Sequence, residues 1–113
     1  MRTFTYSHYV GDDVAIIGDA EGFGAVTHID NTELISPIYH EILPIDLNVK
    51  TLLVFERRME NLVIGIYSVA LREWLHLPQF THATIKNFHT LWVWIGKHRG
   101  ECDIITGKIT WKR

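Results

Sequence analysis

Hydrophobic and polar positions alternate along much of the first half of the chain, a pattern typical of half-buried strands. Residues 2–9 alternate in this way. Residues 14–17 and 24–29 are apolar runs on either side of a glycine-rich stretch, residues 18–24. Because glycine adopts a positive φ readily, this stretch predicts a tight hairpin turn.

The stretch from 30 to 47 has a broken pattern that contains Pro37 and Pro44. Proline removes a backbone donor and fixes φ, so we expect no long regular element there. Ser36 and Pro37 favour the start of a single helical turn, which would run through residues 36–41.

The second half contains a clearer set of strands. Residues 51–56 and 62–69 are rich in β-branched and aromatic side chains, and the intervening residues 57–61 predict a hairpin. Residues 62–69 are apolar at both odd and even positions, so both faces of the strand would be apolar. This pattern indicates a central strand covered on both faces. Residues 73–77 predict a further strand that ends at Pro78.

A long amphipathic helix is predicted at about residues 81–99. Five large apolar side chains fall on one arc of about 120° when the segment is drawn as a helix. They are Ile85, Phe88, Leu91, Trp92 and Ile95. Thr81 is suited to cap the start and Gly100 to end the helix, with three basic or histidine residues in the last turn. Residues 102–106 and 108–111 then return as strand. The expected fold is α+β, a mostly antiparallel sheet with this one helix packed on it.

Composition is that of one globular domain spanning residues 1–113. The chain has 47% hydrophobic and 21% charged residues. Its one cysteine, Cys102, excludes an intrachain disulfide and is expected to be a buried structural thiol. The sequence lacks the apolar core of a signal peptide and any apolar run near the ~20 residues that span a bilayer. We therefore expect a cytoplasmic protein.

Charge is divided unevenly along the chain. Residues 1–50 carry eight acidic and two basic residues, whereas residues 51–113 carry five acidic and nine basic residues. One interpretation is that the halves complement each other in the fold; the other is that each offers a charged face to a different partner. No dense basic stripe of the kind found in nucleic-acid binders is present.

Trp94 and Val93 lie off the apolar arc of the predicted helix. With His89, they are the candidate interface residues, because exposed aromatic side chains are enriched at the centres of protein interfaces. The alternative is that a loop or residues 30–47 cover Trp94 within the molecule. Off-face aromatics and edge strands are also compatible with a homodimer.

No catalytic or metal-binding pattern stands out. His82 and His89 are seven residues apart, which is too far along a helix to share one metal ion, and there is no HExxH motif. We therefore predict no catalytic residues, no metal site and no cofactor. The first hypothesis is a non-enzymatic module that docks on another macromolecule, such as a phage-type host-directed inhibitor, an immunity-type protein or a particle component.

From residue 51 onward, the order hairpin, strand, helix, strand resembles the C-terminal half of GNAT acetyltransferases. Residues 62–69 and 73–77 stand where that family has its third and fourth strands, and residues 81–100 where it has the acetyl-CoA helix. The resemblance implies a second hypothesis, a reduced acyl-CoA-dependent N-acyltransferase. Such an enzyme would need an open cleft between the two strands.

In the family, backbone amides of a Q/R-x-x-G-x-G/A loop hold the pyrophosphate of acetyl-CoA. Gln79 matches the first position, whereas His82 and Thr84 replace both glycines. The resemblance therefore implies acetyl-CoA at Gln79, His82 and Thr84, with Glu56 or Glu73 as a candidate base. A side chain in place of glycine obstructs a close approach of the backbone to phosphate.

Overall fold

The computed structural model describes residues 3–113. The regular elements in that range are all β-strands. The first sheet contains β1 (Tyr6–Gly11), β2 (Val14–Asp19), β3 (Gly22–Thr27) and β4 (Glu33–Tyr39). The middle sheet contains β5 (Glu41–Asp46), β6 (Lys50–Arg58), β7 (Asn61–Ser68) and β8 (Glu73–Phe80). The last sheet contains β9 (His82–Asn87), β10 (Thr90–Ile95), β11 (His98–Asp103) and β12 (Ile109–Trp111).

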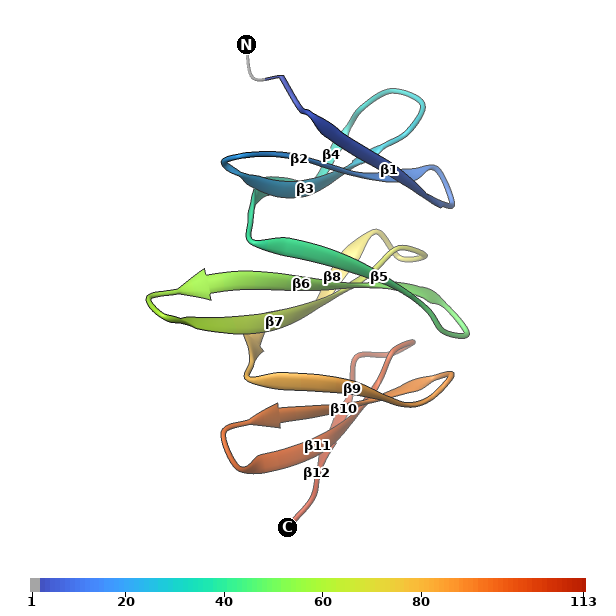
Figure 1. The fold of residues 1–113 in the computed structure, drawn as a ribbon. Coiled ribbons are helices and arrows are strands. Elements are labelled where there is room, and N and C mark those ends of the chain that lie inside the picture. The colour runs from blue at the N-terminus through green and yellow to red at the C-terminus, as the bar shows by residue number, and fades with distance from the viewer. Residues whose placement is uncertain (1–2) are drawn as a thin grey trace.

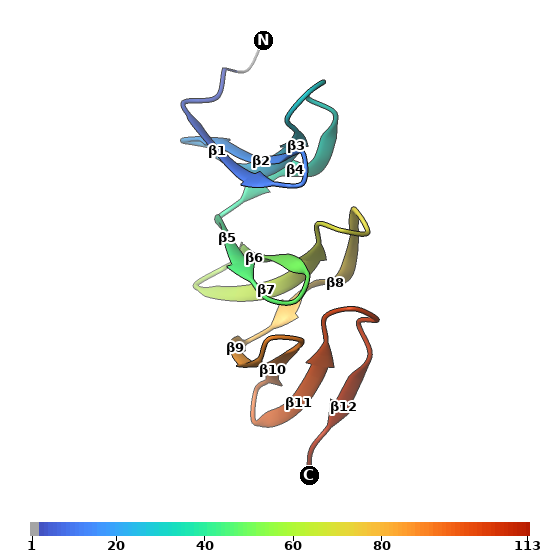
Figure 2. The same cartoon turned by 90° about the vertical axis from the view of Figure 1, so that its right-hand side faces the viewer.

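Each sheet is an antiparallel meander in which consecutive strands are neighbours. The three sheets stack face to face in chain order, with the first sheet at one end of the stack and the last sheet at the other (Figure 1). Figure 2 shows that β1, β5 and β9 lie along one side of the stack and β4, β8 and β12 along the other. The chain therefore crosses from the last strand of one sheet to the first strand of the next. Successive blades of a β-propeller are arranged in this way.

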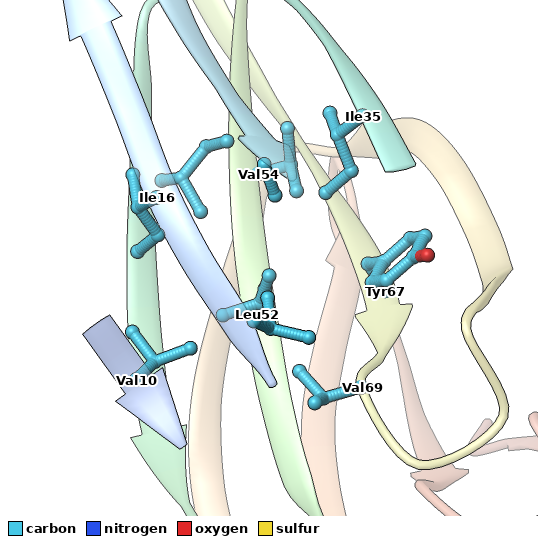
Figure 3. Close-up of a cluster of buried hydrophobic side chains, with 10 residues drawn as sticks. Val10, Ile16, Ile35, Leu52, Val54, Tyr67 and Val69 are labelled. Atoms are coloured by element: carbon cyan, nitrogen blue, oxygen red, sulfur yellow. The ribbon is translucent and has the colours of Figure 1, made fainter. Parts of the chain in front are cut away.

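The first and middle sheets enclose one hydrophobic core. Ile16, Ala25 and Ile35 lie side by side on adjacent strands and face the middle sheet, where Leu52 and Tyr67 are also paired. Figure 3 shows Ile16, Ile35, Leu52 and Tyr67 pointing into the space between the two sheets. Apolar residues at every second position bury one face of each strand, and that burial stabilises the stack.

The middle and last sheets enclose a second core. Leu53 and Ile66 of the middle sheet pack in one buried cluster with Leu91, Val93 and Cys102 of the last sheet. The middle sheet is thus apolar on both faces, as expected of a layer between two others. The predicted central strand at 62–69 is confirmed as β7, which lies between β6 and β8.

The predicted α+β fold is wrong, because residues 81–99 form β9, β10 and the start of β11 instead of a helix. Leu91 and Val93 are fully buried while Trp92 and Trp94 point to the opposite face, which is a period of two. The run is rich in β-branched and aromatic residues, which fit strands better than helices. Gly96, with a φ of 60°, begins the two-residue turn that joins β10 to β11.

The expectation for residues 30–47 is also wrong. The segment forms β4 and β5, with no helical turn at 36–41. Pro37 and Pro44 are tolerated because β4 and β5 are edge strands of their sheets. An edge strand has a neighbour on one side only, so a residue without an N–H group can be accommodated there.

Two predicted hairpins are confirmed. β2 and β3 pair from Asp19↔Gly22 outward, and β6 and β7 pair from Arg58↔Asn61 outward. The strand predicted at 73–77 is confirmed as part of β8, but the predicted end at Pro78 is wrong, because β8 continues to Phe80. Within the described range, no helix is long and apolar enough to cross a membrane.

Candidate functional site

The last sheet has one face that packs on the middle sheet and one face that points away from it. Leu91 and Val93 of β10 occupy the inward face. Because successive side chains of a strand alternate, Trp92 and Trp94 lie on the opposite face, which we term the outward face of the last sheet. Within residues 3–113 no further sheet covers this face, which lies at the C-terminal end of the stack (Figure 1).

Two cross-strand rows of side chains build the outward face. In one row, Trp94 of β10 lies between His82 of β9 and Arg99 of β11. The His82 and Trp94 rings are 4.9 Å apart between centroids. In the other row, Trp92 lies between Thr84 and Glu101. Directly opposed side chains in a sheet are close enough to hold each other in place.

Charged side chains surround the Trp92 ring. The Arg99 guanidinium lies 4.2 Å from the ring centroid and the Lys86 ammonium lies 4.8 Å from it. Glu101 forms ion pairs with Lys86 and with Lys112, whose nitrogen is 2.6 Å from the carboxylate. Cation–π contacts at exposed sites are worth about 0.5–1 kcal/mol each. The face therefore presents two tryptophans held in fixed positions among cationic groups.

A shallow hollow lies beside Glu101 on the same face. It has a volume of about 220 Å³ and is lined by Thr90, Glu101, Asp103, Thr106, Lys108 and Thr110. A second, larger pocket of about 440 Å³ lies between the first and middle sheets, and Tyr39, Glu56 and Arg57 contribute to its lining.

The structure separates the three predicted interface residues. Trp94 lies half-buried at the centre of the outward face. Val93 is fully buried between the middle and last sheets, so its side chain offers no surface for a partner. His89 is exposed in the β9–β10 turn, where its ring nitrogen lies 3.1 Å from the Thr90 hydroxyl. Residues 30–47 form strands of the first and middle sheets, whereas Trp94 lies in the last sheet.

The residues assigned to acetyl-CoA do not form one loop. Gln79 lies on β8 in the middle sheet, whereas His82 and Thr84 lie on β9 in the last sheet. No helix starts at residue 81, so the free amides expected at a helix N-terminus are not formed there. β7 and β8, the strands between which a cleft was expected, are hydrogen-bonded neighbours. Glu56 pairs with Arg58, with 2.7 Å between nitrogen and oxygen.

Among residues 3–113, burial or hydrogen bonding shifts the pKa of Cys102, Tyr39, Tyr67 and Asp30. Burial, and secondarily Asp103, raises the pKa of the Cys102 thiol to about 12. Burial raises the pKa of Tyr39 and of Tyr67, whereas hydrogen bonds from Thr27 and Thr32 lower the pKa of Asp30. All four lie away from the outward face of the last sheet. In the part of the chain that the structure describes, no three His, Cys, Asp or Glu side chains form a group that could hold a metal ion.

Sequence reasoning missed three residues of the outward face. Trp92 was expected on the buried arc of a helix, Arg99 at the end of that helix, and Lys86 had no assigned role. A test for alternation would have found Trp92, because Leu91, Val93 and Ile95 share one parity and Trp92 and Trp94 share the other. No local pattern places Lys86 and Arg99 beside the Trp92 ring.

Comparison with known proteins found no matching family model, no matching curated protein and no matching solved structure.

Proposed function

We propose that the protein is a non-enzymatic interaction module that docks on another macromolecule through the outward face of its last sheet. The observation that carries this proposal is the row of His82, Trp94 and Arg99 beside Trp92, on a sheet face that no other layer covers within the described residues. Tryptophan and arginine are the residue types most enriched at binding hot spots.

The chemistry of the face supports binding in preference to catalysis. His82 and Arg99 contact tryptophan rings, and Glu101 is engaged by two lysines. A nucleophile paired with a base would be expected in a catalytic site. Aromatic rings held by cations instead offer a rigid apolar contact area that a partner can cover at little cost in conformational entropy.

Affinity capture with a matched pair of variants tests the proposal. Trp94→Ala removes the centre of the outward face, whereas Trp111→Ala removes a partly exposed tryptophan that packs against Gly100 on the other side of the same sheet. We expect wild type and Trp111→Ala to retain the same specific partner and Trp94→Ala to lose it. Equal capture by all three proteins, each shown to be folded, would reject the outward face as the docking surface.

A further inference from the structure

The two ends of the stack carry opposite charge. Residues 3–40, which hold the first sheet, contain six acidic residues and no lysine or arginine. Residues 82–113, which hold the last sheet, contain six lysines and arginines and two acidic residues. The middle sheet lies between them (Figure 1), so these charges do not face each other within one molecule.

The first sheet also has an outward face. Tyr9, Ala15, Val26 and Glu33 form one cross-strand row. Ala15 and Val26 are buried although they alternate with residues of the core, and the Tyr9 ring at one end of the row lies 4.7 Å from the His28 ring. Glu33 is exposed at the end of the row.

A second row on the same face consists of small or aliphatic side chains. Ser7 lies beside Ile17, which lies beside Gly24. Side chains on this part of the face therefore project only a short distance from the sheet, whereas the outward face of the last sheet carries two bulky tryptophans. A face with small side chains is one against which another sheet can pack closely, and sheets in face-to-face packing lie about 10 Å apart.

We propose that the partner of the outward face of the last sheet is the outward face of the first sheet of a second copy, so that the chains stack head to tail. This inference rests on the proposed function and names its partner. The new contact repeats the layering that the molecule already uses twice, sheet upon sheet in the same chain order. It brings the cationic sheet, with Arg99 and Lys86, toward the anionic sheet, with Glu33.

Opposite charge favours this pairing over the symmetric one. Two last sheets face to face would bring Arg99, Lys86 and their copies together, and like charges across an interface repel each other. A head-to-tail contact uses two different patches, so it closes into a ring if the rotation per copy permits and otherwise extends.

Two variants test the inference, each with one of the two proposed contact faces disrupted. The tail is the outward face of the last sheet and the head is the outward face of the first sheet. The tail variant, Trp94→Ala with Arg99→Glu, loses the contact on the last sheet. The head variant, Ser7→Arg with Glu33→Lys, adds bulk and positive charge to exposed positions on the first sheet. Circular dichroism and thermal unfolding first establish that both are folded, and native mass spectrometry and light scattering then give the assembly size.

We expect wild type to assemble at micromolar concentration and each variant alone to remain a single chain, with association at least about tenfold weaker. An equimolar mixture should form particles of two chains, one of each variant, because one intact tail meets one intact head. A single-chain wild type at every concentration, or a mixture that stays single-chain, overturns the inference.

A head variant that still pairs with itself also overturns the inference, because it would show a symmetric contact between last sheets. The proposed function fails separately, when capture of a partner does not depend on Trp94. A single-chain wild type that still captures another protein in a Trp94-dependent way therefore rejects the second copy and leaves the docking face in place.

Discussion

The inward and outward faces of the last sheet differ in what they contribute, although the same strand builds both. On β10, Leu91 and Val93 point inward and are fully buried in the core shared with the middle sheet. Trp92 and Trp94, which alternate with them, are half-buried among Arg99 and other polar groups. Adjacent residues of the same strand thus have different roles, because one position stabilises the fold and the next is available for binding.

Residue size and hydrophobicity alone therefore do not distinguish these two roles. Tryptophan is the larger side chain, yet valine is the one whose environment is entirely apolar. The difference lies in what covers each face, and it predicts that changes on the inward face alter stability whereas changes on the outward face alter association.

The largest effect is expected when a charge is placed on the inward face. Val93→Asp buries an unpaired carboxylate, at a cost of several kcal/mol, which is comparable to the whole stability of a small domain. We expect this variant to be unfolded at room temperature by circular dichroism and NMR. Trp94→Asp, one residue away on the outward face, is the control and should remain folded. Equal loss of structure in both would remove the distinction between the faces.

Truncation of single side chains should separate the faces by smaller amounts. Leu91→Ala leaves a cavity in the second core and should reduce the free energy of unfolding by about 2–5 kcal/mol. Trp94→Ala should reduce it by about 1 kcal/mol, since the ring is not enclosed by the core. Urea denaturation at a concentration where both proteins are single chains measures both values, and the reverse order would contradict the assignment of faces.

The pH dependence of stability tests the inward position of Cys102. Its pKa is raised from 9.0 to about 12, so the folded chain keeps a proton that the unfolded chain releases above pH 9. The unfolded state then binds fewer protons, and the free energy of unfolding should fall by on the order of 1 kcal/mol per pH unit as the pH rises from 9 toward 12.

Urea titrations of wild type and Cys102→Ala at pH 7 to 10 isolate this contribution. The advantage of wild type over the variant should shrink above pH 9. Parallel profiles, or rapid reaction of the native thiol with a thiol reagent, would show that the side chain is not enclosed.

The smallest effect is expected for the ion pairs of the outward face. Glu101→Gln removes both lysine contacts, but the lysine side chains are about two-fifths exposed and screened by water. We expect a loss of about 0.5 kcal/mol or less at low salt and less still at about 0.5 M salt. A loss of several kcal/mol would mean that the outward face also holds the fold together.

Local turn chemistry and strand patterns were readable from the sequence. The glycine-rich turn before β3, the turn before β7, the central position of β7 and the burial of Cys102 all follow from residues close together in the chain. These features depend on short-range geometry, which composition and alternation describe directly.

The last sheet was misread because its apolar residues fit two periods. Leu91, Trp92 and Ile95 lie on one arc of a helix, yet Leu91, Val93 and Ile95 also lie on one face of a strand. Helical spacing fitted residues 81–99 as one long segment with polar residues at both ends. Packing against the middle sheet nevertheless selects the strand conformation, because tertiary contacts override local preference. The stacking of three sheets, and with it the uncovered outward face, depends on contacts between distant residues that no local pattern records.

Sedimentation velocity of the wild-type chain and of Trp94→Ala over a dilution series, in low salt, tests most directly whether the outward face of the last sheet binds a second copy of the chain. We expect the wild-type sedimentation coefficient to rise with concentration, while Trp94→Ala stays at the value of one chain with its fold intact. A wild-type protein that sediments as one chain at every concentration, or a variant that assembles as wild type does, would contradict this expectation.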